Sequence, residues 1–350
     1  MVKKILVFNV GSSTIKFSLF ENREKILEGK YEKLKSKEDY EKSFEKISNE
    51  LSKKVGFDII AHRVVHGGNM KSPVKIDKKV KEKIRDFSKF APLHNSRELM
   101  IINLAEKFKK PQFAVFDTSF FIKLPEITKL YPIPKELSKK YHIRKYGFHG
   151  LSHESVSRGL KGKTITCHLG RGASMTAIKN NKPIDTSMGL TPLEGLMMCT
   201  RSGDLDPGIV LFLEKKGYDT DKILNIKSGI KGITNQKYSD FRDILKNIKN
   251  KEAKLAYDMF VYRIIKYIGA YTAVLDGLNN LIFTGAIGEN APRLRRDICE
   301  HLDFLGIKLD KNKNEKNKGL ISSSSSKVKI YVKSANEDEI IIREVLKIIK

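Results

Sequence analysis

The sequence predicts an α/β protein in which one domain plan is duplicated, with a cleft between the two halves. Residues 3–20 predict a strand, a turn of small polar residues and a second strand, and residues 164–188 repeat that plan. Residues 281–302 add a strand that leads through a glycine-rich turn into a helix. Donor-rich turns in both halves indicate two phosphate-binding turns that face each other, and the third turn is suited to a nucleoside.

Length and composition fit a folded protein of more than one domain, with 350 residues of which 40% are hydrophobic. Neither a signal sequence nor an apolar run of membrane-spanning length occurs, so we expect a cytoplasmic protein that binds no membrane. The net charge of +26 comes from lysines scattered through almost every segment, which argues against a nucleic-acid surface. Cys167, Cys199 and Cys299 lack paired spacing and predict buried thiols.

The first strand, residues 3–10, runs into a turn that carries many polar side chains. They are Asn9, Ser12, Ser13, Thr14 and Lys16. An ordinary β-hairpin is the alternative, but a turn that only reverses the chain needs few hydrogen-bond donors. The spacing of a Walker A loop is absent, and a strand follows instead of a helix. We therefore expect this turn to bind phosphate.

Helices and strands follow this hairpin in alternation. A strand at residues 26–31 precedes a helix at residues 40–55, where apolar residues recur at helical spacing. Another helix opens at Pro92 and continues through Leu104. Later helices are predicted at residues 257–278, at residues 292–302 and after Asn336, where acidic residues mark a helix start.

Three polar residues lie beside predicted strands or glycines in the first half of the chain. Arg63 ends the apolar strand at residues 57–65, where it must meet an anion or reach solvent. Asp117 follows the strand at residues 111–116, a place where α/β proteins bind ligands, although a helix cap is the alternative. His149 has Gly147 and Gly150 around it, which suggests an exposed, positioned imidazole, whereas a lone loop histidine is more often inert.

The segment from residue 164 to residue 207 forms the second strand–turn–strand unit. Gly170 and Gly172 have no Cβ, so backbone N–H groups in their turn can approach an anion. Asn180 and Asn181 turn the chain again. Arg201 follows in a loop of small polar residues, where we expect it to hold a charge and not to fill a core.

Two later segments are suited to a nucleoside. Asp240 is predicted to begin a helix as its acidic N-terminal residue. Residues 281–290 read as a strand that enters a glycine turn, from which helix N-terminal amides can meet a nucleotide. Glycine-rich turns of this kind are weak signals when they stand alone.

These units together resemble the plan of the actin, hexokinase and Hsp70 superfamily: a duplicated two-domain fold with mixed β-sheets, flanking helices and an interdomain active-site cleft. We expect the first domain to comprise residues 1–120 and 337–350, so that the C-terminal helix closes it. The second domain then comprises residues 121–336 and carries nucleotide and dimer contacts.

From end to end, the chain resembles the acetokinase family of short-chain carboxylate kinases. Its motifs are long and stand in the family's order. They are Asn9-Val10-Gly11-Ser12-Ser13-Thr14-Ile15-Lys16, His62-Arg63-Val64-Val65-His66-Gly67-Gly68, Phe116-Asp117-Thr118, Tyr146-Gly147-Phe148-His149-Gly150, Asp185-Thr186-Ser187-Met188-Gly189, Thr191-Pro192-Leu193-Glu194-Gly195-Leu196, Thr200-Arg201-Ser202-Gly203-Asp204 and Ile287-Gly288-Glu289-Asn290.

The resemblance implies reversible phosphoryl transfer between ATP and acetate, giving ADP and acetyl phosphate, with Mg²⁺ or Mn²⁺ and a homodimer. It also implies that Arg63 and Arg201 hold carboxylate and phosphoryl oxygens, for which a planar guanidinium is suited. His149 would donate a hydrogen bond to the transferring group. Asp117 and Glu337 would organise the metal site, with Asn9 nearby.

The other site residues implied by the resemblance fall into three sets. Those for the acyl methyl group are Val65, Leu93, Phe148 and Pro192, those for the nucleotide are Asp240, Phe241, Arg242, Ala286, Gly288 and Asn290, and those for the phosphates are Ser12, Thr14, Lys16, His168, Gly170, Arg171 and Gly172.

The chain departs from the family pattern at a few positions. It is shorter than typical members, mainly between the first hairpin and Arg63. Arg171 stands where the family has Asn, while Ala286 and Cys199 replace glycines. Arg171 and Ala286 leave a different phosphoryl donor, such as GTP or pyrophosphate, as an alternative, although the intact segment 287–290 favours a nucleotide.

Three rival functions remain at the level of sequence. A propionate or butyrate kinase differs from an acetate kinase only in pocket size, and one methylene changes binding by about 1–3 kcal/mol. A basic nucleic-acid-binding protein would bind DNA or RNA with a steep salt dependence. A chaperone-like ATPase of the same fold would hydrolyse ATP without any carboxylate.

Overall fold

The computed structural model describes residues 3–11, 13–54 and 56–349. Within it the chain divides into two compact units. Unit 1 contains Met1–Ile122, Phe148–Ser155 and Asn336–Lys350, and unit 2 contains Lys123–Gly147 and Val156–Ala335. The boundaries expected after residues 120 and 336 lie within two residues of two of these junctions. The assignment of residues 148–155 to unit 1 was not anticipated.

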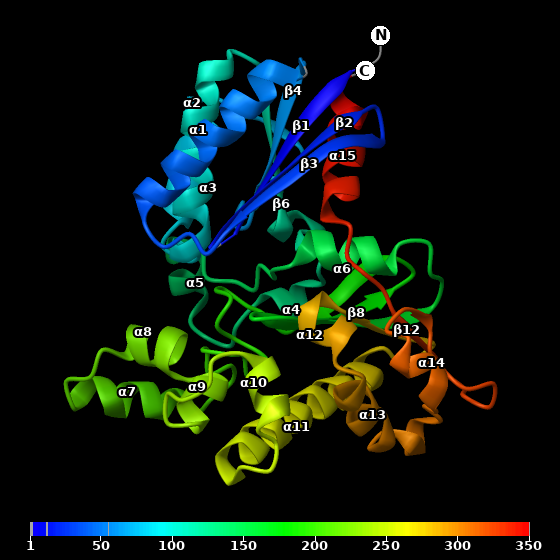
Figure 1. The fold of residues 1–350 in the computed structure, drawn as a ribbon. Coiled ribbons are helices and arrows are strands. Elements are labelled where there is room, and N and C mark those ends of the chain that lie inside the picture. Colours follow the sequence, from blue (N-terminus) through cyan, green and yellow to red (C-terminus); the bar gives the residue numbers. More distant parts are fainter. Residues whose placement is uncertain (1–2, 12, 55, 350) are drawn as a thin grey trace. The chain divides into compact units, whose positions relative to one another are not determined.

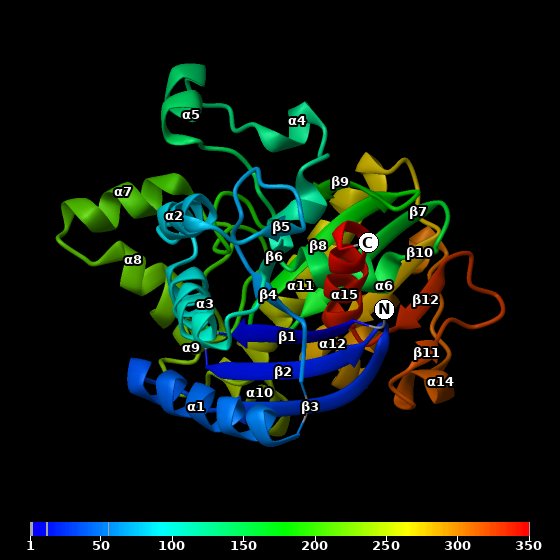
Figure 2. The same ribbon diagram turned by 90° about the horizontal axis from the view of Figure 1, so that it is seen from above.

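The described residues of unit 1 form one mixed six-stranded sheet in the order β3-β2-β1-β4-β6-β5. The strands β1, β2 and β3 form an antiparallel meander, which Figure 2 shows as three adjacent ribbons, while β4 and β6 run parallel to β1 and β5 pairs antiparallel with β6. Their bounds are β1 Lys4–Gly11, β2 Thr14–Glu21, β3 Glu24–Glu32, β4 Ile59–Val64, β5 Val74–Lys75 and β6 Gln112–Phe116.

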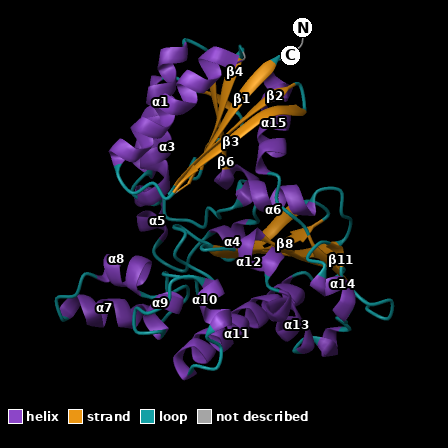
Figure 3. Ribbon diagram, in the orientation of Figure 1, coloured by secondary structure: helices purple, strands orange, loops and turns teal. Residues whose placement is uncertain are grey.

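Alternation along β1 explains why helices cover both faces of this sheet, as Figures 1 and 3 show. Leu6 and Phe8 pack in one cluster with apolar residues of α1 (Lys37–Lys54) and α3 (Pro92–Leu104). Ile5 and Val7 pack in a second cluster with residues of α15 (Glu337–Ile348), and Leu151 of α6 (Gly150–Ser157) joins them. The other helix of this unit, α2 (Lys78–Phe87), buries Ile84.

Unit 2 repeats this topology in its own sheet, whose described strands have the order β11-β12-β10-β7-β8-β9. Here β7, β8 and β9 form the antiparallel meander, β10 and β12 continue in parallel, and the short strand β11 pairs antiparallel with β12. The duplication expected from the sequence is therefore confirmed strand by strand. The bounds are β7 Lys163–Leu169, β8 Ala173–Lys179, β9 Lys182–Thr186, β10 Asn280–Thr284, β11 Gly319–Leu320 and β12 Lys329–Val332.

The remaining helices belong to unit 2, and two of them differ from expectation. The helix predicted at residues 257–278 is α11, which begins at Lys251 because the Asn250 side chain accepts backbone N–H groups there. The glycine turn predicted at residues 285–290 is itself the short helix α12 (Gly285–Asn290). The bounds of α11 are Lys251–Val274, and the others are α4 Glu126–Lys129, α5 Lys135–Tyr141, α7 Pro207–Lys215, α8 Thr220–Lys222, α9 Gly229–Ile233, α10 Phe241–Lys246, α13 Pro292–Glu300 and α14 Lys311–Glu315.

Among the described residues, none of the helices combines the length and apolar character that crossing a membrane requires. The three cysteines, Cys167, Cys199 and Cys299, are free thiols in the interior, as expected. Burial raises the pKa of each of them.

Candidate active site

In unit 1, Arg63 is the centre of a partly buried polar cluster. Its Nη2 donates to Asp117 Oδ2 at 2.6 Å, and its Nη1 donates to Asn9 Oδ1 at 3.1 Å. Glu337 Oε2 lies 3.3 Å from the same Nη1 and accepts a hydrogen bond from Asn9 Nδ2 at 2.8 Å. Four residues that are far apart in the sequence therefore meet in this cluster.

The sheet topology explains why these residues meet. In the parallel pair β1/β4, Phe8 lies beside His62, so Asn9 and Arg63 come next on their strands. In the parallel pair β4/β6, Val64 lies beside Phe116, so Asp117 follows at the same edge. The carboxyl ends of neighbouring parallel strands are the common ligand-binding edge of α/β sheets.

The cluster carries more negative than positive charge. Burial raises the pKa of Asp117, which is fully enclosed, while Arg63 lowers it. Burial alone would lower the pKa of Arg63, but Asp117 and Glu337 together raise it, so the guanidinium is charged. Because two carboxylates surround one guanidinium, the cluster has capacity for a further cation.

Glu98 is a buried acid beside this cluster that the sequence interpretation missed. Its Oε2 accepts the Val65 N–H at 2.9 Å, whereas its Oε1 has no hydrogen-bond partner. Burial raises the pKa of Glu98 to about 8, and Arg63 opposes that increase. Its position in the sequence could have indicated its burial, because Asn95, Glu98 and Ile102 lie at helical spacing on one face of α3, and all three are buried.

His149 lies at the start of α6 in a constrained backbone. Its φ is +54°, and the side chain is half-buried, so the expectation of an exposed imidazole was wrong. The next residue, Gly150, packs closely on the Asp117 backbone of the same unit, since a Cβ there would lie 1.9 Å from the Asp117 carbonyl oxygen. Only glycine allows the histidine loop to contact the Asp117 backbone this closely.

The other predicted residues of unit 1 lie on the first hairpin or in the apolar interior. Lys16 is the cross-strand partner of Asn9, so their side chains are on the same face of the sheet, and Thr14 is the partner of Gly11. Val65 and Phe148 are buried. Ser12 and the side chain of Leu93 lie outside the described part of the chain.

In unit 2, the glycine turn lies between β7 and β8 as predicted. Gly170 donates its N–H to Gly172 O at 3.0 Å, and the exposed Arg171 stands at the tip of the turn. His168 on β7 is the register partner of Thr284, the last residue of β10, so α12 begins beside this turn. The predicted phosphate turn and the predicted nucleoside segment are thus neighbours.

The α12 segment carries three of the predicted nucleotide residues. Ala286 and Asn290 are exposed, and Asn290 Nδ2 donates to Ala286 O at 3.0 Å. Gly288 is buried against β7, where a Cβ would lie 3.6 Å from Cys167 O. Ala286 and Asn290 are therefore accessible to a ligand, whereas Gly288 packs α12 against β7.

Arg201 is a partly buried arginine. Its Nη1 donates to Pro192 O at 2.9 Å, and no described carboxylate forms an ion pair with it. Burial lowers the pKa of Arg201 to about 10, and the positive charge of Arg171 adds to that decrease. Two neighbouring cations, one of which has no ion-pair partner among the described residues, are suited to binding an anion.

The loop around Arg201 depends on a glycine with a left-handed backbone. Gly203 has a φ of +68°, and a Cβ there would lie 2.4 Å from Leu196 O. The carboxylate of Asp204 is occupied elsewhere, because it accepts from Gly195 N and from the Tyr267 hydroxyl. The Asp204 carboxylate of this loop therefore does not neutralise the charge of Arg201.

Residues 240–242 lie close to this loop, since the electrostatic partners of Cys199 include Asp240 and the Phe241 backbone. Arg242 donates to Asp240 through Nε at 3.0 Å and Nη2 at 2.7 Å, and Asp240 caps α10. The Phe241 ring is buried against Phe260, with their ring centroids 5.1 Å apart. We therefore expect Phe241 to support the loop from inside.

Comparison with known proteins decides the family. A family model described as the Acetokinase family matches residues 26–343. The chain belongs to the acetokinase family. Acetate kinases of Thermotoga petrophila and Thermosipho melanesiensis are 43% and 44% identical to it, in alignments that cover 99% of this chain and 99% and 98% of theirs. The first alignment spans 398 positions, whereas this chain has 350 residues, so the alignment contains positions that this chain lacks.

Solved structures agree with this assignment to the acetokinases. Acetate kinase from Porphyromonas gingivalis is 38% identical, with a TM-score of 0.88 and coverage of 99% of this chain and 100% of that chain. A propionate kinase from Francisella tularensis is 35% identical, with a TM-score of 0.87 and coverage of 98% of both. A putative N-acetylmannosamine kinase from Listeria monocytogenes, 13% identical with a TM-score of 0.53 and 98% and 99% coverage, shares the fold alone. The predicted actin/hexokinase/Hsp70-like fold is confirmed.

The acetokinase resemblance implies a magnesium ion, and the donor set of unit 1 fits one. Asp117, Glu337 and Asn9 offer carboxylate and amide oxygens, which Mg²⁺ prefers, and their cluster has surplus negative charge. Within the described residues there is no group of three or more His, Cys, Asp or Glu side chains that could hold a metal. A site with two carboxylates is nevertheless ordinary for Mg²⁺ that shares its coordination with waters and substrate phosphates.

Proposed function

We propose that this acetokinase transfers the γ-phosphoryl group of ATP reversibly to acetate, giving ADP and acetyl phosphate. The observation that carries the proposal is Arg201, a desolvated guanidinium beside Arg171 with no acidic partner among the described residues. Such a group gains most from an anion that brings its own charge, and the transferring phosphoryl group is that anion. Family membership supplies the reaction class.

The chemistry explains why both units present arginines and no strong base is required. An acetate oxygen attacks the γ-phosphorus in line, the new P–O bond forms, and the electron pair of the broken P–O bond goes to ADP. Acetate is already ionised at neutral pH, so no proton has to be removed. The protein has to bring two anions together and neutralise their charge.

We assign the carboxylate of acetate to Arg63. Its guanidinium is held in one orientation by Asp117 and Asn9, which pre-organises the remaining N–H groups. The methyl group would lie against Val65, Leu93, Phe148 and Pro192, and His149 would donate a hydrogen bond to the transferring group. Asp117, Glu337 and Asn9 would hold Mg²⁺ or Mn²⁺, which when bound supplies charge neutralisation on the phosphate oxygens.

We assign the nucleotide mainly to unit 2. Gly170, Arg171 and Gly172 offer backbone N–H groups and a cation to the phosphates, with His168 beside them. By the family resemblance, Thr14 and Lys16 of the first hairpin would also bind phosphate. The adenosine would lie on the exposed residues Ala286, Asn290 and Arg242, while Phe241 and Gly288 support them from the interior.

A propionate kinase is the second candidate, because one solved relative with 35% identity carries that name. The acceptor and the donor are tested together by a hydroxamate assay of acyl phosphate formation. Acetate, propionate and butyrate are compared as acceptors, with ATP, GTP and pyrophosphate as donors. We expect the highest kcat/KM for acetate with ATP. A clear preference for propionate or butyrate would replace the assigned acceptor, and a preference for pyrophosphate would replace the donor.

We also propose that the protein is a homodimer that uses the α7 face. None of the residues of α7 is buried, and Leu211 and Phe212 are 60% and 59% exposed. Residues 207–218 carry only Glu214, Lys215 and Lys216 as charges, although the chain as a whole is +26. An apolar, nearly neutral face lets two strongly cationic copies associate with little repulsion. The cytoplasmic location stays a prediction.

A further inference from the structure

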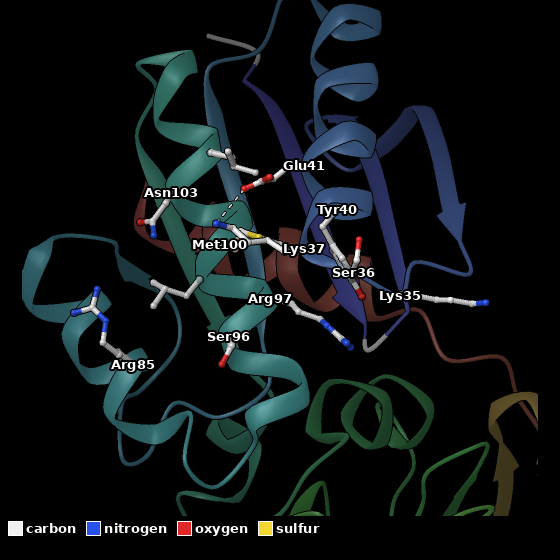
Figure 4. A pocket seen from close by; sticks show the side chains of 12 residues that line it. Lys35, Ser36, Lys37, Tyr40, Glu41, Arg85, Ser96, Arg97, Met100 and Asn103 are labelled. Carbon is white, nitrogen blue, oxygen red and sulfur yellow. Dashed lines mark ion pairs between the residues drawn. The ribbon is translucent and has the colours of Figure 1, made fainter. Parts of the chain in front are cut away.

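Unit 1 contains a cavity of about 650 Å³ that the proposed reaction does not use. It lies between the first turn of α1 and the length of α3, and Figure 4 shows the side chains that line it. None of its lining residues belongs to the candidate active site. Its size is within the range of small-molecule sites in proteins.

The lining of this cavity is strongly cationic. Lys35, Lys37, Arg85 and Arg97 contribute positive charge, and Glu41 is the single carboxylate. Lys37 Nζ lies 3.5 Å from Glu41 Oε1, so this acid is already matched by one cation. The lining therefore has a net positive charge, which favours a ligand with more than one negative charge.

The cavity also has a non-polar wall and a positioned arginine. The Arg97 guanidinium carbon lies 5.3 Å from the centroid of the Tyr40 ring, a distance typical of a cation–π contact. Leu99, Met100 and Leu104 of α3 supply the non-polar surface. In Figure 4, Arg97 and Tyr40 lie at one end of the cavity and Arg85 at the other.

We propose that this cavity binds a small organic phosphate, namely a phosphate monoester on a non-polar or aromatic group. The planar fork of Arg97 matches phosphate oxygens, and Lys35 and Arg85 of the same lining add positive charge. The side chains of Met100 and Leu104 cover the organic part. A monocarboxylate is a poorer match, because its single negative charge offsets less of the net positive charge than a phosphate dianion does.

A ligand in this cavity contacts the structure that supports the first phosphate turn. The Tyr40 hydroxyl donates to Gly11 O at 2.8 Å, and Gly11 is the last residue of β1 before that turn. The buried Tyr40 ring therefore connects the cavity to the hairpin that carries Thr14 and Lys16. The Tyr40 side chain therefore contacts both the proposed ligand site and the end of β1 that leads into the turn.

Calorimetric titration with phenyl phosphate tests the proposal at fixed ionic strength. We expect one site per chain in the wild type and at least a tenfold loss of affinity in Arg97→Gln. Arg97→Lys keeps the charge without the fork and should lose less. The matched control is Lys83→Gln, which removes an exposed cation of α2 outside the cavity and should bind as the wild type does. Circular dichroism checks that each variant is folded.

Two further titrations separate this site from the proposed active site. Arg201→Ala should bind phenyl phosphate with unchanged affinity, and a loss there would place the ligand at the candidate active site and overturn the proposal. Benzoate should bind more weakly than phenyl phosphate by tenfold or more, and equal affinity would refute the phosphate assignment. Equal binding by the wild type and Arg97→Gln, or no binding by the wild type at millimolar concentration, also refutes it.

Discussion

The substitution Glu98→Gln should change how the stability of the protein depends on pH. The pKa of Glu98 rises from its ordinary 4.5 to about 8 because the carboxyl group is buried with one oxygen unpaired. Between these two values the folded protein keeps a proton that the unfolded chain has released. The free energy of unfolding therefore falls as pH rises through this window, by roughly 4–5 kcal/mol in total.

Glutamine does not titrate, yet it keeps an oxygen for the Val65 N–H that Glu98 now accepts. Urea unfolding of both proteins from pH 5 to pH 8.5 should give nearly equal free energies at pH 5, and Glu98→Gln should become progressively more stable than the wild type above that. Glu82→Gln, on the exposed surface of α2, is the control and should follow the wild type at every pH. A difference between Glu98→Gln and wild type that stays constant across this range would refute the reasoning.

Three further outcomes follow from the site and the surface. Arg201→Ala should keep its circular dichroism but lose about 10³-fold or more in kcat, and near-normal turnover would remove the role proposed for this arginine. Gly150→Ala should lower the free energy of unfolding by about 2 kcal/mol or more, because its Cβ meets the Asp117 carbonyl; unchanged urea unfolding would contradict this. Phe212→Glu should shift sedimentation from dimer to monomer while Ile127→Glu, 88% exposed on α4, should not, and a dimer in both would exclude the α7 face.

Much of the fold could be predicted because its signals are local. Alternating apolar residues marked the strands, and the positive φ of Asn180 and Asn181 is the backbone that a tight turn between β8 and β9 requires. The α11 helix was harder, because its first turn, from Lys251, is polar and leaves no apolar stripe. Its start depends on the Asn250 cap.

The site was predictable where motifs and strand ends coincide, as at Arg63 and Asp117. What escaped prediction depends on contacts between distant segments. The orphan oxygen of Glu98 follows from α3 packing on β4, and the half-buried state of His149 accompanies the contact of Gly150 with the Asp117 backbone. No local pattern encodes these contacts, since each requires the tertiary arrangement to be known first.

The two units show how one topology serves two kinds of chemistry. In both, an antiparallel meander is followed by two parallel strands and a short antiparallel one, so polar residues collect at equivalent strand ends. In unit 1 the ends of β4 and β6, together with the start of α15, place two carboxylates around one guanidinium, which suits a cation. In unit 2 the turn after β7 and the loop after β9 bring Arg171 near Arg201, which suits an anion. The two units therefore share their strand order, but their charged residues stand at different places in it, which accounts for the separate roles that we propose.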